Sequence, residues 1–234
     1  MTKKKESTKP AANKKNQRLE DKKMESATRK KILTAAKKVF GENPYHSASI
    51  RAIGKEAGIE HPLINYYFPA KSDLFSAVIS ELEEHRLKHQ TKWLKEAREM
   101  DPHRGFSTFL DKVLDYYNKY PQIFRTIALN LVQTNLIEQI PAYDIIQASF
   151  KRDIEVLRKQ LKMTAPQHEI EMFSHSVSTL MISYLGAANC YATLLNMDPD
   201  SFQYLNWVKE TVVFALLPRL KKMFQRVETI TDTP

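Results

Sequence analysis

The sequence predicts an all-α fold of about nine helices, and three observations support that prediction. From about Ser26 onward, apolar residues recur at spacings of three and four, which is the period of an α-helix face. No segment alternates strictly between apolar and polar residues, as a half-buried strand would. The 234 residues include only 5 glycines against 11 prolines, which argues against turn-rich β-sandwiches, doubly wound nucleotide folds and P-loops. The length suits a small helical domain joined to a larger one with its own core.

The expected helices follow from this period and from the residues that interrupt it. The first patterned helix stops at Gly41, Asn43 and Pro44. A short punctuated segment covers residues 49–68, and a long helix then runs from Lys71 to about residue 100 without Gly or Pro. Five further helices are expected over residues 106–120, 122–139, 142–163, 167–196 and 200–224. Pro218 should end or kink the last of these.

The formal net charge of +9 is concentrated near the N-terminus. Residues 1–31 hold 12 of the 36 Lys and Arg residues but only 4 of the 27 Asp and Glu residues. Residues 1–23 contain almost no large apolar side chain, so we expect a disordered basic extension there. Such an extension is either a solvated tail or an arm that contacts nucleic-acid phosphates.

The cysteine and histidine content limits the possible chemistry. Cys190 is the single cysteine, which excludes a disulfide framework and a Cys-rich zinc site and fits a cytoplasmic protein; in an apolar helix it should be buried. No secretory signal is expected, because the Lys-rich N-terminus has no apolar core behind it. His85 and His89 lie four residues apart without an obvious third ligand, so exposed histidines are favoured over a metal site. We expect no metal and no cofactor.

Residues 172–197 form a run of 26 residues without Asp, Glu, Lys or Arg, long enough to span a bilayer. Serine, threonine, asparagine and histidine dilute its apolar residues, which favours a helix buried against protein over a membrane span. The small residues Gly186, Ala187 and Ala188 would let a partner helix approach closely. We therefore expect no membrane association.

The segment over residues 49–68 has the layout of a helix-turn-helix. Ser49 is placed to cap a helix of two turns, and Gly58 supplies a residue free of Cβ strain at the turn that follows. Pro62 falls in the first turn of the second helix, where a missing N–H does no harm. Ile64 and Phe68, four residues apart, should anchor this second helix to the core.

The outward face of that second helix indicates DNA recognition in the major groove. With Ile64 and Phe68 facing inward, the opposite face presents polar and aromatic side chains instead of the Lys and Glu of an ordinary surface helix. Asn65 can bond adenine through two hydrogen bonds, Leu63 can contact a thymine methyl, and the hydroxyl of Tyr66 can reach a phosphate. The alternative is a plain helix hairpin closed by an aromatic cluster.

Residues 26–75 resemble the N-terminal domain of the TetR (tetracycline-repressor) family of bacterial transcriptional regulators. The residues that carry the resemblance are Ile32, Leu33, Ala36 and Phe40, then 49–53, 57–59 and 67–74. The resemblance implies a helix-turn-helix DNA-binding domain over residues 24–72 and a helical effector-binding and dimerisation domain over residues 73–226. A flexible tail over residues 227–234 completes the expected organisation.

The resemblance also implies which side chains meet DNA. Ser49 and Lys71 would each hold a backbone phosphate, and Arg51 would reach a base. Leu63 and Asn65 stand where the family usually has a small or hydroxyl residue and a Tyr. These two departures leave the operator sequence open, but they do not argue against DNA binding. The full set of expected DNA contacts is Ser49, Arg51, His61, Pro62, Leu63, Asn65, Tyr66, Tyr67 and Lys71.

For the rest of the chain, the resemblance implies a homodimer through the last two long helices and an effector cavity inside the C-terminal domain. The expected function is a repressor, released from a near-palindromic operator by a small apolar or amphipathic molecule. One alternative is a regulator controlled by a partner protein or by oxidation at Cys190. A remote alternative is a helical enzyme or carrier, for which no catalytic motif is present. The candidate cavity residues are Trp93, Phe109, Tyr116, Tyr117, Tyr120, Phe124, Asn130, Phe150, Phe173, Met181, Tyr184 and Asn189.

Overall fold

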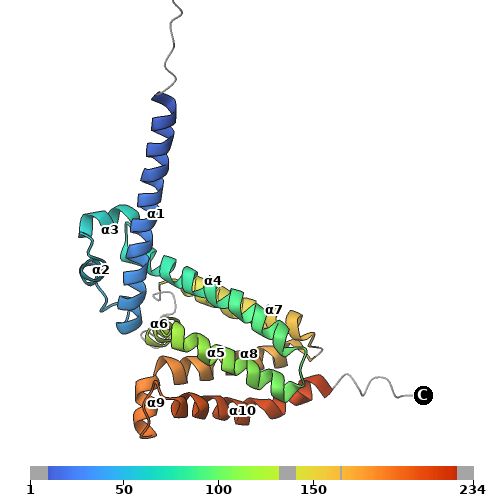
Figure 1. Ribbon diagram of the computed structural model, residues 1–234. Coiled ribbons are helices and arrows are strands. Elements are labelled where there is room, and N and C mark those ends of the chain that lie inside the picture. Colours follow the sequence, from blue (N-terminus) through green and yellow to red (C-terminus); the bar gives the residue numbers. More distant parts are fainter. Residues whose placement is uncertain (1–9, 132–140, 164, 226–234) are drawn as a thin grey trace, which may run out of the picture.

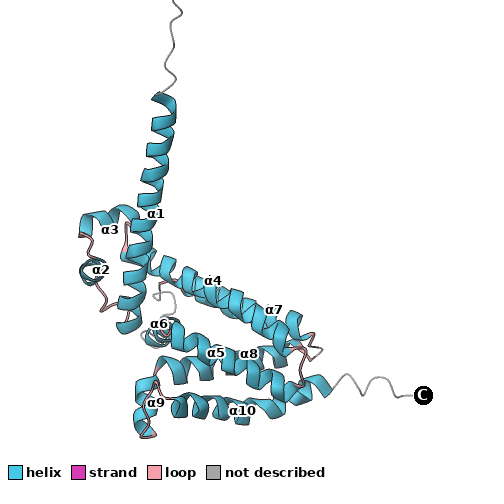
Figure 2. Ribbon diagram, in the orientation of Figure 1, coloured by secondary structure: helices cyan, strands magenta, loops and turns pink. Residues whose placement is uncertain are grey.

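The computed structural model describes residues 10–131, 141–163 and 165–225, and these residues form helices and connecting loops with no strand among them (Figure 2). This confirms the predicted all-α fold. The helices are α1 (Pro10–Glu42), α2 (Ile50–Ala57), α3 (His61–Tyr67), α4 (Lys71–Ala97), α5 (Pro102–Lys119), α6 (Gln122–Leu131), α7 (Tyr143–Leu161), α8 (Gln167–Gly186), α9 (Ala188–Leu194) and α10 (Phe202–Gln225).

The helices form two domains that share α4 (Figure 1). The small domain consists of α1, α2, α3 and the first turns of α4, and the N-terminal part of α1 projects beyond α3. The large domain contains the rest of α4 together with α5 to α10, with α4 packed against α5 and α7. Because α4 belongs to both domains, it can transmit a displacement from one to the other.

Every helix of the small domain contributes at least one fully buried side chain to its core. Phe40, Ile53, Ile64 and Phe75 are examples from α1, α2, α3 and α4 respectively. The rings of Phe40 and Phe75 meet edge to face, with centroids 4.9 Å apart. This packing fixes the direction of α3 and therefore decides which of its side chains face outward.

For residues 10–23 the structure differs from the predicted disorder, because α1 begins at Pro10. The prediction rested on the lack of apolar residues and overlooked helix propensity. Residues 11–31 contain no Gly or Pro and are rich in Lys and Ala, which favour helices. Extending an existing helix also costs far less than nucleating one. Pro10 suits the first helical position. Residues 1–9 and the expected tail over residues 227–234 lie outside the described residues.

The single helix expected over residues 167–196 is two helices, α8 and α9, which meet at Ala187. Gly186 packs against α6 so closely that a Cβ there would lie 2.7 Å from the Phe124 carbonyl oxygen and would also meet Ala128. The small residues therefore permit close helix contact, as predicted, and the partner is α6 of the same chain. The described part of the helix expected over residues 122–139 ends at Leu131.

The last helix continues through Pro218 to Gln225 instead of stopping there. Leu217, Leu220 and Met223 are buried on either side of the proline, so packing against the domain offsets the lost backbone hydrogen bond. Within the described residues, no helix combines the length and hydropathy that a membrane crossing requires.

Candidate nucleic-acid interface and ligand cavity

The backbone of the helix-turn-helix is fixed by three small residues. The Ser49 hydroxyl accepts a hydrogen bond from the Ala52 N–H at 3.1 Å, which confirms the predicted N-cap. Gly58 ends α2 in the left-handed region, at φ 59° and ψ 42°, as the turn requires. Gly54 was missed by sequence reasoning: a Cβ there would lie 2.7 Å from the Ile59 carbonyl oxygen. A glycine in the middle of so short a helix was the available signal.

Helix α3 has one buried face and one solvent-exposed face. Ile64 is fully buried and Phe68 nearly so, whereas Tyr66 is 71% exposed and Leu63 is 44% exposed. Asn65 is also exposed, and its amide nitrogen lies 3.5 Å from Nδ1 of His61. The inward and outward sets therefore agree with the helix geometry predicted for residues 61–68.

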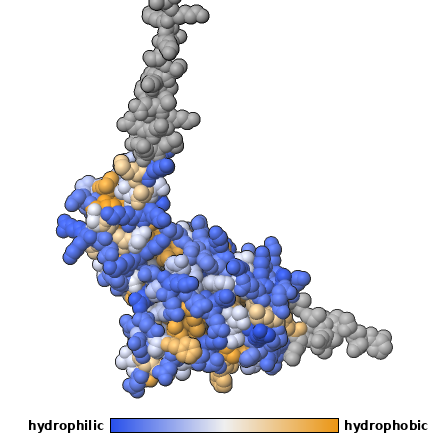
Figure 3. Space-filling model, in the orientation of Figure 1, coloured by the Kyte–Doolittle hydropathy of each residue, from blue (hydrophilic) through white to orange (hydrophobic). Residues whose placement is uncertain are grey.

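The other expected DNA contacts lie around this exposed face. Ser49 and Arg51 are exposed at the start of α2, and His61 and Pro62 are exposed at the start of α3. Tyr67 is half-buried, and its ring meets that of Tyr66 edge to face at 5.2 Å. The surface of the small domain is mostly hydrophilic, with apolar area at α3 (Figure 3).

Lys71 has partners inside the protein. Its Nζ donates hydrogen bonds to the carbonyl oxygens of Tyr45, at 2.8 Å, and Ala48, at 3.0 Å. The ammonium group also lies 4.3 Å from the centroid of the Tyr45 ring, and burial lowers its pKa. Two of its three donors are thus occupied. Lys71 ties the start of α4 to the loop before α2, and one donor remains for a phosphate.

Two basic side chains of α1 also lie beside the helix-turn-helix and were missed by sequence reasoning. The guanidinium of Arg29 stands 5.2 Å from the centroid of the Phe68 ring, at the end of α3. The ammonium of Lys31 lies next to Gly58, at the turn between α2 and α3. Cations at these positions suit a polyanion bound across α3. The basic run over residues 29–31 was the sequence signal.

The large domain contains two neighbouring cavities, with volumes of about 250 Å³ and about 90 Å³. Helices α4, α5, α7 and α8 contribute to both, and α10 closes part of the larger one while α6 closes part of the smaller one. The two linings share Gln90, Phe109, Asp153, Val177 and Ser178. Apolar side chains with a few polar groups are typical of small-molecule sites.

Seven of the twelve candidate cavity residues line these cavities. They are Trp93, Phe109, Tyr116, Phe124, Phe150, Phe173 and Met181. The other five lie outside both linings. Tyr117 is buried in the core against Phe124, Tyr120 and Asn189 are exposed, and Tyr184 packs edge to face on Tyr191 and Trp207. An aromatic pattern along a helix marks the inward face, but it does not separate packed core from cavity wall.

Asn130, the fifth of these residues, connects the two domains. Its Oδ1 accepts a hydrogen bond from the Tyr45 N–H at 2.9 Å, and its Nδ2 donates to the Thr126 carbonyl oxygen at 2.7 Å. It therefore links α6 to the loop before α2, the same loop that Lys71 holds from α4. Asn130 therefore attaches the two domains to each other, and it lies outside both cavity linings.

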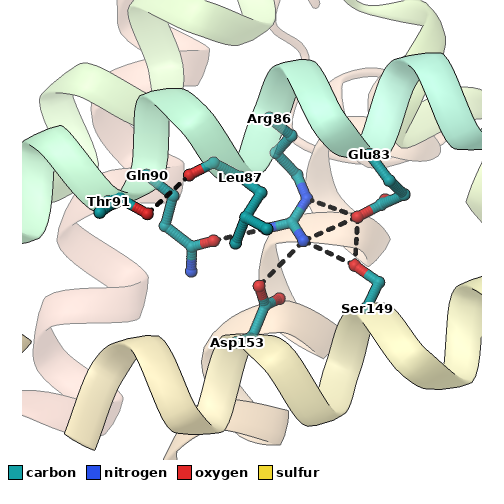
Figure 4. Close-up of polar contacts among 7 residues, drawn as sticks. All are labelled: Glu83, Arg86, Leu87, Gln90, Thr91, Ser149 and Asp153. Atoms are coloured by element: carbon teal, nitrogen blue, oxygen red, sulfur yellow. Dashed lines mark hydrogen bonds and ion pairs between the residues drawn. The ribbon is translucent and has the colours of Figure 1, made fainter. Parts of the chain in front are cut away.

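A buried polar cluster at the cavities was also missed by sequence reasoning. Arg86 of α4 donates hydrogen bonds to Glu83, Gln90, Ser149 and Asp153, and Ser149 is hydrogen-bonded to Glu83 as well (Figure 4). Burial opposes the charge of Arg86, but the two carboxylates outweigh it and raise its pKa, so the guanidinium stays ionised. The spacing of Glu83 and Arg86 on one helix could have indicated that these two side chains pair. Nothing in the sequence indicated that α7 packs against them.

The structure also differs from the expected exposure of His85 and from the expected burial of Cys190. His85 is half-buried, not fully exposed: its Nδ1 lies 2.8 Å from the Tyr116 hydroxyl, and burial together with nearby His89 lowers its pKa. No group of three metal-ligating side chains occurs among the described residues. Cys190 is exposed on α9, whereas the sequence predicted a buried thiol.

Comparison with known proteins identifies a family match for the helix-turn-helix segment. Residues 32–78 match the family described as bacterial regulatory proteins, tetR family. The HTH-type transcriptional regulator UidR of Escherichia coli (strain K12) is 40% identical over 60 residues, which cover 26% of this chain and 31% of UidR. This chain therefore matches about a third of that relative's length.

Solved structures extend the similarity of fold over most of the chain. A transcriptional regulator from Rhodococcus sp. Rha1 has a TM-score of 0.60 at 18% identity, covering 81% of this chain and 96% of the other. FadR from Bacillus subtilis, solved in complex with stearoyl-CoA, has a TM-score of 0.57 at 18% identity. The match covers 78% of this chain and 96% of FadR. The helix-turn-helix segment of this chain therefore matches the family of bacterial regulatory proteins, tetR family, and most of the chain shares the fold of these solved structures.

Proposed function

We propose that the protein is a dimeric DNA-binding transcriptional repressor that a small molecule releases from its operator. This proposal rests on the exposed face of α3. Asn65 and Tyr66 face solvent while Ile64 anchors the helix, so an amide and a phenol are held outward on a rigid element. Arg29 and Lys31 add positive charge beside them. The UidR relative, a transcriptional regulator that is 40% identical over 60 residues, supports this function.

The dimer would form through α8, α9 and α10. Large apolar side chains are exposed on these helices, and Phe214 in the middle of α10 is 86% exposed. Hydrophobic surface lies over the part of the large domain where α9 and α10 run (Figure 3). Burial of such a patch favours association of two copies. A two-fold dimer would present its α3 helices to successive major grooves, about 34–36 Å apart, and so prefer a near-palindrome.

Release would follow from the way the cavities are joined to the small domain. Helix α4 lines both cavities and holds the loop before α2 through Lys71. Helix α6 lines the smaller cavity and holds the same loop through Asn130. A ligand that displaces either helix would therefore shift α2 and α3. DNA and ligand would oppose each other by an equal coupling free energy, typically about 1–3 kcal/mol.

The cavities favour a small-molecule signal over oxidation of Cys190, which lies on α9 and lines neither of them. FadR, a protein of similar fold, is solved in complex with stearoyl-CoA, which supports a ligand site in a fold of this kind.

The proposal is tested by selecting bound duplexes from a randomised DNA pool with the purified full chain. We expect enrichment of a near-palindrome with half-sites about 10 base pairs apart, centre to centre, or a multiple of that spacing. Light scattering should give twice the chain mass of 27.2 kDa for the free protein, and that mass plus the mass of one duplex for the complex. A pool that shows no enrichment over several rounds would contradict sequence-specific binding, and a monomer on DNA would contradict the dimer.

A further inference from the structure

The polar cluster at the cavities is unbalanced in charge. It contains one cation, Arg86, and two carboxylates, Glu83 and Asp153, both of which are buried (Figure 4). The Nε and Nη2 donors of Arg86 are occupied: both reach Glu83, and Nη2 also reaches Asp153. Its Nη1 donates to Gln90 at 2.8 Å. An anionic ligand beside Arg86 would also lie beside two carboxylates, which would repel it.

Asp153 supplies the surplus negative charge. Its Oδ1 accepts from Arg86 at 2.9 Å, while its Oδ2 accepts no hydrogen bond from any residue that the structure describes. The residue is only 5% exposed, yet it lines both cavities. Burial raises the pKa of its carboxyl, and Arg86 offsets part of that effect. A second cation at Oδ2 would stabilise the carboxylate.

Among the described residues that line the cavities, no cation other than Arg86 pairs with this carboxylate, although the charge of Arg152 also acts to lower its pKa. Among the described residues that line the larger cavity, charge comes from Asp153 and Arg98. Arg98 is exposed and paired with Glu99 at 2.8 Å. Arg152, the neighbour of Asp153 on α7, lines neither cavity.

The remaining lining suits a hydrophobic cation. Phe109 lines both cavities and Trp93 lines the smaller one, so aromatic rings are present where a ligand cation could lie near Asp153. Most of the other lining side chains are apolar, with Gln90, Ser174 and Ser178 as polar exceptions in the larger cavity. We propose that the cavity binds an amphipathic cation, whose protonated or quaternary nitrogen pairs with Asp153 and whose apolar body fills the larger cavity. This rests on the ligand site of the proposed function and specifies its chemical class.

The test uses three probes with the same straight carbon chain and different head groups: octylamine, octanol and octanoate. Binding to the full chain is measured by calorimetry at neutral pH without DNA. We expect octylamine to bind at least about tenfold more tightly than either other probe, because only it brings a cation to the carboxylate. Equal binding of the three probes, or a preference for octanoate, would overturn the proposal.

Two variants on α7 test whether the preference for octylamine depends on the carboxylate of Asp153. In Asp153→Asn, octylamine should lose about tenfold in affinity while octanol binding stays the same. Glu155→Gln makes the same charge change at an exposed position two residues away and should leave both unchanged. An octylamine preference that survives in Asp153→Asn would overturn the proposal. If that variant does not fold, the ranking of the probes on the unmodified chain decides.

The outcome is independent of DNA binding. A chain that binds octylamine selectively but enriches no duplex would support the cation site and contradict the proposed function. A chain that enriches an operator but binds the three probes equally would support the function and overturn the cation site.

Discussion

The candidate functional side chains face solvent in the small domain and face the interior in the large domain. In the small domain, Asn65 and Tyr66 face solvent, and the helix that carries them is anchored by a different residue, Ile64. In the large domain, Arg86 and Asp153 contact the cavities and at the same time hold α4 to α7. Recognition and stability are therefore separable in the small domain and coupled in the large one.

The largest expected effect comes from Arg86→Met, which leaves the carboxylates of Glu83 and Asp153 buried without their cation. Removing one partner of a buried ion pair typically costs about 3–5 kcal/mol. We expect a loss of that size in the free energy of unfolding, measured by urea denaturation at neutral pH. Arg98→Met removes an exposed arginine and should cost less than about 0.5 kcal/mol.

The loss in Arg86→Met should also depend on pH. Burial already raises the pKa of Asp153 in the folded chain, and losing Arg86 raises it further. The folded state then holds a proton that the unfolded state has released, so stability falls as the pH rises above about 4, the unfolded pKa of Asp. Equal losses at pH 5 and pH 8 would show that the carboxylates are not the cause.

Next in size is Ile64→Ala, which removes the anchor of α3. Truncation of a fully buried Ile typically costs about 2–5 kcal/mol, and DNA binding should be lost with the position of α3. Leu63→Ala, at the exposed neighbour, should change stability by less than about 0.5 kcal/mol. Comparable losses in unfolding free energy for the two variants would contradict the separation of recognition from stability.

A smaller effect is expected for Asn130→Ala, which cuts the attachment of α6 to the loop before α2. The Tyr45 N–H loses its acceptor, at a cost of about 1–3 kcal/mol. Hydrogen exchange of the Tyr45 amide should become faster, because that bond protects it in the native chain. Asn118→Ala, at an exposed position on α5, is the matched control. Unchanged exchange at Tyr45 would exclude Asn130 as the link between the domains.

The contrast between the two domains also explains which features could be predicted from the sequence. The caps and turns of the small domain are local, so Ser49, Gly58 and the inward pair Ile64 and Phe68 could be placed from their spacing alone. The exposed face of α3 followed from that geometry.

The large domain depends on contacts between segments far apart in the chain. Glu83 and Arg86 meet Ser149 and Asp153 only because α4 packs on α7, and no periodicity shows which helices are neighbours. Asn130 could be identified as a buried polar residue, but its partner Tyr45 lies 85 residues away. The helical start of α1 was missed because the prediction required a buried apolar face. An existing helix can extend without such a face.

The central claim is that the outward side chains of α3 determine which DNA sequence is bound. The most direct test repeats the selection from randomised DNA with Asn65→Ala beside the native chain. We expect the variant to lose its preference at one position of each half-site, by about 1–3 kcal/mol, while its unfolding free energy stays within about 0.5 kcal/mol of the native value. An identical enriched sequence from both proteins would contradict the claim.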